Sequence, residues 1–328
     1  MTVEQAVWAE KHRPSNLDEV IGQKQQVDRM KRWVDDDTMP HLLLHGPAGT
    51  GKTASAVAFA KEKYGDEWRS NILEFNASDD RGIDVIREDI KSAAQQSASG
   101  QHSYKLLYLD EADNLTKDAQ AALRRVMEQY SDQTRFILSC NYPSKLIDPI
   151  QSRCTPLPFR RLENDEIEEL ITRILEKEDV EYEESAVSKI IEYVEGDARR
   201  AVQTLQTSVQ DGVLTENIIE VVGGQVEDEV VEEMISKCFN GQMDEAHEMV
   251  VTEILPNVTD YSRFTNTLMK KIQYSDELPN DVRWYAISQI GDLERNIMEG
   301  ANPHTQITSY LSTLPTIRYA SIPNYSDE

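Results

Sequence analysis

Short apolar runs alternate with longer amphipathic stretches over the first half of the chain. The runs that we interpret as buried strands are residues 41–45, 71–75, 105–110 and 135–140. The stretches with the length and apolar spacing of helices are 52–63, 83–97 and 116–130. This alternation is typical of an α/β domain with a parallel sheet, in which crossover helices cover the sheet.

The pattern changes after PLPFRRL at 156–162, where we expect the strands to stop. Apolar spacing predicts helices over 163–178, 183–195 and 197–210. The pair Gly223-Gly224 marks a boundary, and four or five further helices are expected beyond it, with breakers at 278–280 and 302–303. The domains predicted are an α/β domain at 1–161, a small helical domain at 162–226 and an all-α domain at 227–328.

The segment GPAGTGKT, residues 46–53, joins the first predicted strand to the first predicted helix and fits the pattern G-x-x-x-x-G-K-[ST]. Its glycines let a phosphate approach bare backbone N–H groups, and the following helix points its positive end at the same place. Lys52 can reach the β- and γ-phosphates of ATP, and Thr53 can hold Mg²⁺. A chance glycine-rich turn is the alternative, but the flanking strand and helix are those that phosphate binding requires. The predicted phosphate-binding residues are Gly46, Pro47, Ala48, Gly49, Thr50, Gly51, Lys52 and Thr53.

Polar side chains follow two of the other predicted strands. LLYLDEAD at 106–113 ends a strand in Asp110, which could complete the magnesium shell, and Glu111, which could polarise the attacking water. FILSCN at 136–141 ends in Asn141, whose amide could orient a water or touch the γ-phosphate. An acidic strand end in an acidic protein, and a turn residue before a proline, are the simpler interpretations. Separate metal and water residues would imply hydrolysis and not only binding.

The composition and the N-terminal residues indicate the cellular compartment in which the protein works. The chain has 328 residues, 39% of them hydrophobic, and no apolar run approaches the length of a membrane helix. The first residues lack a cationic and apolar signal segment, so we expect a cytoplasmic protein without membrane contact. Cys140, Cys154 and Cys238 have no paired spacing, which favours reduced thiols over disulfides or a zinc site.

The formal net charge is −25, and the acidic residues are spread along the whole chain. This favours adaptation to a high-salt cytoplasm, where screening relieves the repulsion, although a very soluble surface is the simpler interpretation. The charge weighs against nucleic-acid binding unless cations are concentrated locally.

Two further segments, DPIQSRC at 148–154 and EGDARRAVQTLQ at 195–206, carry arginines that are candidates for the nucleotide site. Alone, each arginine would be a surface salt bridge. Together with the phosphate loop, DEAD and the strand ending in Asn141, they resemble an AAA+ ATPase. WAEKHRPSNLDEVIGQ (8–23), EFNASDDRGIDVIR (74–87) and DAQAALRRVMEQY (118–130) narrow the resemblance to the small subunits of replication factor C, the archaeal and eukaryotic sliding-clamp loader.

The resemblance implies roles for residues that the spacing alone leaves open. Asn141 would be the first sensor and Arg199 the second sensor, in a helical lid over the same nucleotide. Arg153 would be the arginine finger that acts on ATP held by a neighbouring subunit. Arg13 and Ile21, in the segments EKHRP and VIGQ, would line the adenine pocket, although the family more often has tyrosine where His12 stands.

The resemblance also implies partners. These are a distinct large subunit, other copies of the small subunit, a sliding clamp and primer-template DNA bound without sequence preference. Arg81, Arg87 and Lys117 lie at or near the first turns of the helices expected to track the DNA backbone. They could instead balance neighbouring aspartates. The C-terminal helices would form an oligomerisation collar.

Two other functions are compatible with an AAA+ domain. A branch-migration motor would need its own DNA-binding module, and no winged-helix pattern or basic recognition helix is found in 227–328. A non-hydrolysing scaffold subunit held in a ring by ATP would not need Glu111, Asn141 or Arg199.

Overall fold

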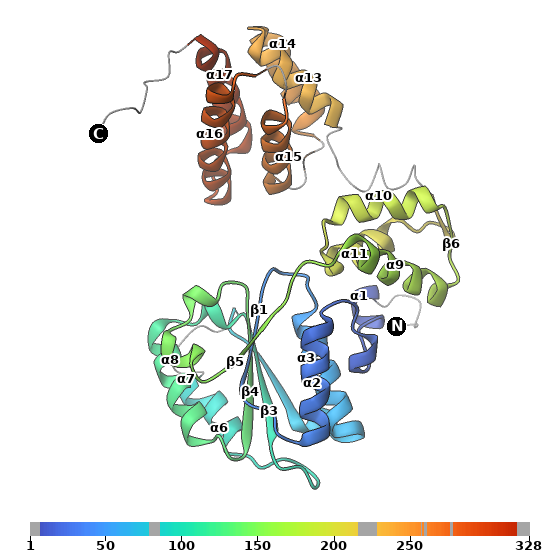
Figure 1. Cartoon of the computed structure of the whole chain (residues 1–328), viewed down its shortest axis with the longest axis vertical. Coiled ribbons are helices and arrows are strands. Elements are labelled where there is room, and N and C mark those ends of the chain that lie inside the picture. The colour runs from blue at the N-terminus through green and yellow to red at the C-terminus, as the bar shows by residue number, and fades with distance from the viewer. Residues whose placement is uncertain are drawn as a thin grey trace. The chain divides into compact units, whose positions relative to one another are not determined.

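A computed structural model describes residues 7–78, 86–215, 228–256, 258, 261–275 and 278–319. The chain divides into two compact units, residues 1–222 and 223–328 (Figure 1). The first unit combines a parallel sheet with helices and the second is helical, which confirms the predicted α/β class with an all-α C-terminal part. Among the residues described, no helix is both long and apolar enough to cross a membrane.

The sheet of the first unit is parallel and has the strand order β2-β3-β4-β1-β5. Its strands are β1 (Leu42–His45), β2 (Ile72–Asn76), β3 (Lys105–Asp110), β4 (Thr134–Cys140) and β5 (Thr155–Pro158). The first four confirm the four predicted strands to within one residue at each end. Because β1 lies between β4 and β5, the phosphate loop that follows β1 starts near the carboxyl ends of β3 and β4.

The fifth strand, β5, was not predicted, because Pro156 and Pro158 break its sequence pattern. A proline has no N–H to donate to a sheet and is tolerated at an edge. β5 is an edge strand that pairs only with β1. The backbone N–H groups of Thr155 and Phe159 donate to the carbonyls of His41 and His45 at 2.7 Å each, so the prolines alternate with the residues that pair.

Helices cover both faces of the sheet (Figure 1). Leu42 and Leu44 face a core shared with α2 (Lys24–Asp36) and α3 (Lys52–Tyr64). Leu107 and Leu109 of β3 face a second core, shared with α6 (Lys91–Ala94), α7 (Lys117–Gln129) and α8 (Asp148–Gln151). Thr116 caps α7 by accepting from the N–H of Ala119 at 3.2 Å.

Short elements connect these helices and strands. They are α1 (Trp8–Lys11), η2 (Leu17–Glu19), η3 (Gly65–Glu67), α4 (Trp68–Asn71), η4 (Ile86–Ile90), η5 (Ala112–Asn114) and η6 (Pro143–Lys145). The helix predicted over 83–97 is described only from Ile86, and it is π-helical through Ile90 before α6. It ends at Ala94, three residues earlier than predicted.

The rest of the first unit is a three-helix layer with a core of its own. Its helices are α9 (Asn164–Glu178), α10 (Glu184–Val194) and α11 (Ala198–Ser208), as predicted to within two residues. The expectation that strands stop after 162 was wrong, because β6 (Glu181–Tyr182) and β7 (Val213–Leu214) pair in parallel. Two-residue strands are too short to produce a periodic pattern.

The two ends of the N-terminal segment pack against this helical layer. Trp8, Ala9 and Ile21 pack against its core, and the N–H of Trp8 donates to Oε1 of Gln206 at 2.9 Å. His12 pairs with Glu178 at 2.6 Å. Leu17, between these ends, contacts the sheet domain instead: it lies in the core shared with α2 and α3, and its N–H donates to Oε2 of Glu62 in α3 at 2.9 Å.

The second unit has five α-helices among its described residues, as expected. They are α13 (Asp228–Phe239), α14 (Met243–Met249), α15 (Tyr261–Gln273), α16 (Asn280–Met298) and α17 (Pro303–Tyr319), with a π-helical turn, η7 (Val250–Ile254), after α14. All five contribute to one core. The predicted breakers coincide with the start of α16 at Asn280 and of α17 at Pro303. The Gly223-Gly224 boundary lies outside the described residues.

Candidate nucleotide site

The loop between β1 and α3 folds as a phosphate-binding loop requires. Gly46, Gly49 and Gly51 have φ values of 143°, 72° and 89°. A Cβ atom on Gly46 would lie 2.0 Å from the carbonyl oxygen of Phe159, so only glycine fits beside β5. Gly51, in the left-handed region, ends the loop immediately before the first residue of α3, so that the free N–H groups of α3 start at the loop.

Lys52 is the buried cation of this loop, with 8% of its surface exposed. Its Nζ donates to the carbonyl oxygens of Gly46 at 2.7 Å and Pro47 at 2.8 Å, and to Oδ1 of Asn141 at 3.1 Å. Burial lowers the pKa of the Lys52 ammonium, whereas the Asp110 carboxylate raises it. Three neutral oxygen atoms therefore hold the Lys52 ammonium in place, and anionic oxygens of a ligand could replace them.

A chain of hydroxyl groups connects the sheet to the start of α3. The phenol of Tyr108 donates to Oγ1 of Thr53 at 2.9 Å, and Thr53 donates to Oδ2 of Asp110 at 2.9 Å. Burial raises the pKa of Tyr108, so its hydroxyl remains a donor. Thr53 and Asp110 thus present adjacent hard oxygen atoms, the ligand type that Mg²⁺ prefers. This donor set fits a magnesium ion.

Glu111 follows β3 with a positive φ of 51°. Its Oε2 accepts from Nδ2 of Asn114 at 2.9 Å and from the hydroxyl of Ser78. Asn114 also donates to Oγ of Ser78 at 2.9 Å, which closes a three-residue cluster. Ser78 follows β2, so the strand next to β3 supplies a partner for the carboxylate. In this conformation Glu111 is engaged within the chain.

A cavity of about 420 Å³ brings the predicted nucleotide residues together. Such a volume is typical of a small-molecule site. From the sheet domain it is lined by Ala48, Gly49, Thr50, Gly51, Lys52, Thr53, Asp110, Glu111 and Asn141. From the N-terminal segment and the helical layer it is lined by residues including Arg13, Ile21, Ile174, Lys177 and Arg199. Gly46 and Pro47 do not line it but hold Lys52.

The helical layer contributes a cation to the cavity that the structure leaves unpaired. Arg199 is exposed, in the first turn of α11, and has no hydrogen bond or ion pair with any residue described. Arg13 pairs with Glu10 at 2.6 Å.

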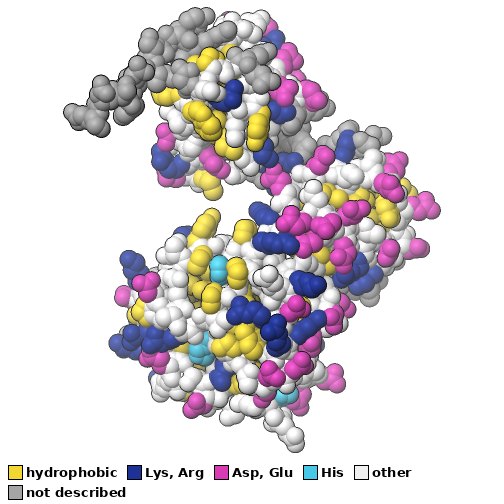
Figure 2. Space-filling model, viewed as in Figure 1, with side chains coloured by type: hydrophobic (Ala, Val, Ile, Leu, Met, Phe, Trp, Pro, Cys, Tyr) yellow, Lys and Arg dark blue, Asp and Glu magenta, His cyan; other side chains and the backbone are white. Residues whose placement is uncertain are grey.

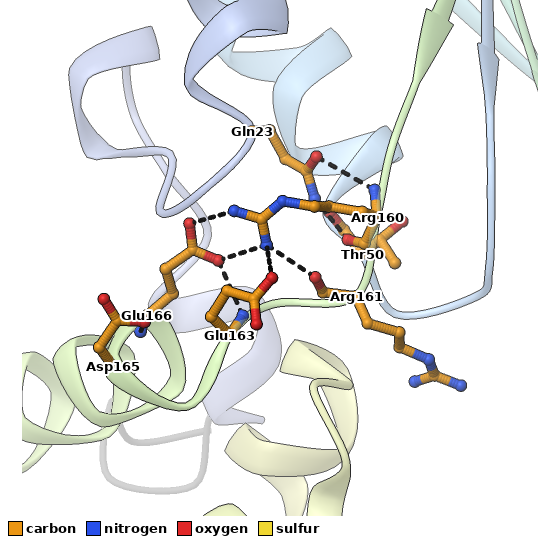
Figure 3. Close-up of polar contacts among 7 residues, drawn as sticks. All are labelled: Gln23, Thr50, Arg160, Arg161, Glu163, Asp165 and Glu166. Carbon is orange, nitrogen blue, oxygen red and sulfur yellow. Dashed lines mark hydrogen bonds and ion pairs between the residues drawn. The ribbon is translucent and has the colours of Figure 1, made fainter.

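A buried glutamine that the sequence did not single out joins the phosphate loop to the end of β5 (Figure 3). Gln23 is 3% exposed, and its Nε2 donates to the carbonyl oxygens of Thr50 at 3.3 Å and Arg160 at 2.6 Å. Its Oε1 accepts from the N–H of Arg160 at 3.2 Å. The Arg160 guanidinium in turn donates to both carboxylate oxygens of Glu166, in α9, at 2.9 and 2.7 Å.

Arg153 lies away from the cavity of its own chain. It is among the exposed residues, follows α8, donates to the carbonyl oxygen of Pro149 at 2.7 Å and forms an ion pair with Glu128. It does not line the cavity.

Of the residues predicted to contact DNA, only Lys117 is fully described. It is exposed in the first turn of α7. Arg81 lies outside the described residues, and the side chain of Arg87, in η4, is not described either.

Family models match both parts of the chain. Residues 42–160 match the family model of the ATPase family associated with various cellular activities (AAA). Residues 226–313 match the model of the replication factor C C-terminal domain.

The chain is 42% identical over 316 residues to the replication factor C small subunit of Sulfurisphaera tokodaii, covering 95% of both chains. It is 40% identical to that of Halobacterium salinarum, covering 94% of this chain and 96% of the relative. Among solved structures, the RuvB Holliday junction branch migration motor of Thermotoga maritima is similar, with a TM-score of 0.56 and 20% identity, over 75% of this chain and 88% of that chain. That likeness concerns the fold alone.

Proposed function

This chain belongs to the replication factor C small-subunit family and is an AAA+ ATPase of the clamp-loader type, and we propose that it binds ATP with Mg²⁺ in the cavity between its sheet domain and helical layer. The observation that carries the proposal is the convergence of Lys52, Thr53, Asp110 and Arg199 on that one cavity.

The phosphate loop and its two oxygen ligands would position the nucleotide. Lys52 would exchange its contacts with Gly46 and Pro47 for the β- and γ-phosphates, since an ammonium binds an anionic phosphate oxygen more strongly than a neutral carbonyl oxygen. Thr53 and Asp110 would hold Mg²⁺, which when bound neutralises charge on the phosphates. Arg13 and Ile21 would border the adenine.

Hydrolysis would require Glu111 to orient and polarise a water, with Asn141 and Arg199 near the γ-phosphate. Glu111 is bonded to Ser78 and Asn114, so the carboxylate would have to leave both partners before acting on water. We therefore propose that Ser78 and Asn114 restrain Glu111.

Arg153 would act as a finger on the ATP of an adjacent subunit. Its exposure and its absence from the lining of its own cavity support a role in trans. The surrounding assembly would contain a large subunit and further copies of this chain. We propose that residues 1–161, 162–226 and 227–328 act as ATPase domain, lid and collar of this assembly.

Sliding clamp and primer-template DNA would be the assembly's substrates. Lys117, exposed at the N-terminus of α7, would contact the DNA backbone together with Arg81 and Arg87. Each subunit would supply a few contacts without reading sequence, and ATP binding would favour the closed state that hydrolysis releases.

The clamp-loading function is tested by measuring ATP turnover of the complex assembled from this chain and its large subunit. We expect turnover to rise several-fold when sliding clamp and primed DNA are added together, and less with either alone. Stimulation by four-way junction DNA without a clamp would support a branch-migration motor instead. Absence of turnover under all conditions, despite nucleotide binding, would support a scaffold.

The net charge of −25 leads us to propose a high-salt cytoplasm as the protein's environment. Acidic side chains are spread over the visible face, whereas basic ones form a few groups (Figure 2). Because salt screens repulsion among these acids, the melting temperature should rise by several degrees or more between dilute and molar potassium chloride. An unchanged melting temperature would contradict this prediction.

A further inference from the structure

A carboxylate of the helical layer lies directly against the phosphate loop. Asp197 precedes α11 and caps it, since its Oδ1 accepts from the N–H of Arg200 at 3.0 Å. A Cβ atom on Gly49 would lie only 1.8 Å from that Oδ1, so the carboxylate packs on the bare Cα of a loop glycine. The N–H of Ala198 donates to the carbonyl oxygen of Gly49 at 2.9 Å. The loop and the start of the Arg199-bearing helix therefore form one contact.

This contact places a negative charge beside a loop built to bind anions. Without compensation, the Asp197 carboxylate would repel the phosphates of an incoming nucleotide. The compensating charge is Arg161, whose Nη1 lies 2.9 Å from Oδ2 of Asp197. Arg161 comes from the segment after β5, and the N–H of its neighbour Leu162 donates to the carbonyl oxygen of Gly196 at 3.0 Å. The backbone thus brings Arg161 alongside Asp197.

The two neighbouring arginines of this segment have different partners. The Arg160 side chain is directed to Glu163 and Glu166 of the first helix in the layer, whereas the Arg161 guanidinium lies apart from that cluster (Figure 3). Arg161 instead pairs with the residue that caps α11. Neither Arg161 nor Asp197 lines the nucleotide cavity, so an effect of either on nucleotide binding would act through the loop.

We propose that Arg161 is a positioning residue for ATP binding, which neutralises Asp197 so that this carboxylate can hold α11 against Gly49 without repelling the nucleotide phosphates. The inference rests on the proposed nucleotide site. It predicts that Arg161 matters for nucleotide affinity only while Asp197 carries its charge.

The test is a charge-rescue cycle on the full chain. Equilibrium binding of magnesium with a non-hydrolysable ATP analogue is measured for the natural chain, Arg161→Gln, Asp197→Asn and the double variant. We use the lowest potassium chloride concentration at which all four have the same circular-dichroism spectrum. Arg161→Gln should bind roughly tenfold more weakly, because one unit charge beside the phosphates is left uncompensated. Asp197→Asn keeps a capping oxygen and should remain within about twofold of the natural chain.

The nucleotide affinity of the double variant decides whether Arg161 acts by neutralising Asp197. Rescue to within about twofold of the natural chain supports charge compensation, and the Arg161→Gln defect should then shrink as salt is raised. A double variant as weak as Arg161→Gln would overturn the inference, because Arg161 would then act independently of Asp197. Unchanged affinity in Arg161→Gln would overturn it as well and reduce the pair to a surface salt bridge. If the natural chain binds no nucleotide, the proposed site itself is wrong.

Discussion

Replacing Lys52 with alanine is expected to weaken ATP binding by roughly 10- to 100-fold and to reduce turnover to background. The Nζ atom is the charged donor inside the phosphate loop, and it is already desolvated by its burial. A charge-assisted hydrogen bond to a phosphate contributes more than a neutral one, and no other lysine side chain among the described residues donates to the loop. Binding is measured with a fluorescent ATP analogue, and turnover by phosphate release.

The matched control is Lys63→Ala, which removes the same charge from the same helix. Lys63 pairs with Asp37 and lies over the ring of Tyr104 at 4.5 Å, and neither partner lines the cavity. We expect its nucleotide affinity and turnover to remain within about twofold of the natural chain. Near-normal affinity in Lys52→Ala, with the control also normal, would be incompatible with the phosphate-loop assignment.

Replacing Arg153 with alanine is expected to leave ATP binding by the isolated chain intact and to cut hydrolysis in the assembled complex by about 10³- to 10⁵-fold. That range is typical of arginine fingers, which stabilise the charge that develops on the transferred phosphoryl group. The arginine would be available to a neighbour because it is exposed and, among the described residues, pairs with groups on its own surface, Glu128 and the Pro149 carbonyl. Lys145→Ala, an exposed cation shortly before α8, serves as the charge-matched control.

Mixing variants tests whether Arg153 acts between subunits. Glu111→Gln lacks the water-polarising carboxylate but keeps Arg153, and Arg153→Ala has the opposite defect. Mixed complexes should contain some sites with both groups present, so partial activity should return. If size-exclusion chromatography shows mixed assemblies that are no more active than either variant alone, Arg153 does not act in trans.

Much of this architecture could be predicted from local pattern. Four buried strands, the helices α9, α10 and α11 and the starts of α16 and α17 follow from periodicity and from breakers such as Pro303. The loop at residues 46–53 is also a local feature, because its glycines, Lys52 and Thr53 are contiguous in the sequence. The common position of Asp110, Glu111 and Asn141 could also be predicted. They lie at the end of β3 or directly after β3 and β4, and parallel strands end at the same edge of the sheet.

Other features became visible only in the folded chain. β5 was not predicted because a strand with two prolines is tolerated only at the edge of a sheet. Whether a strand lies at an edge depends on the order of all the strands, which the local sequence does not show. Gln23 and Ser78 lie in segments that carry the family resemblance, but the sequence did not indicate their contacts, since the partners of a single amide or hydroxyl lie up to 137 residues away in the chain. Trp8 and Ile21 likewise pack on a helical layer that begins more than 140 residues later, whereas Leu17 between them packs on the sheet domain.

The charged residues show the same difference between what the sequence determines and what the fold decides. The sequence alone determined that 59 acidic residues outnumber 34 basic ones in the chain and that arginines occur in SRC and GDARR. Which acid each arginine neutralises was decided by tertiary structure: Arg160 meets Glu166, whereas the adjacent Arg161 meets Asp197, 36 positions onward, over Gly49. The physical reason is that propensity and hydrophobic periodicity act within a few residues, whereas Coulomb and hydrogen-bond partners are selected by distances in space that only the packed backbone sets.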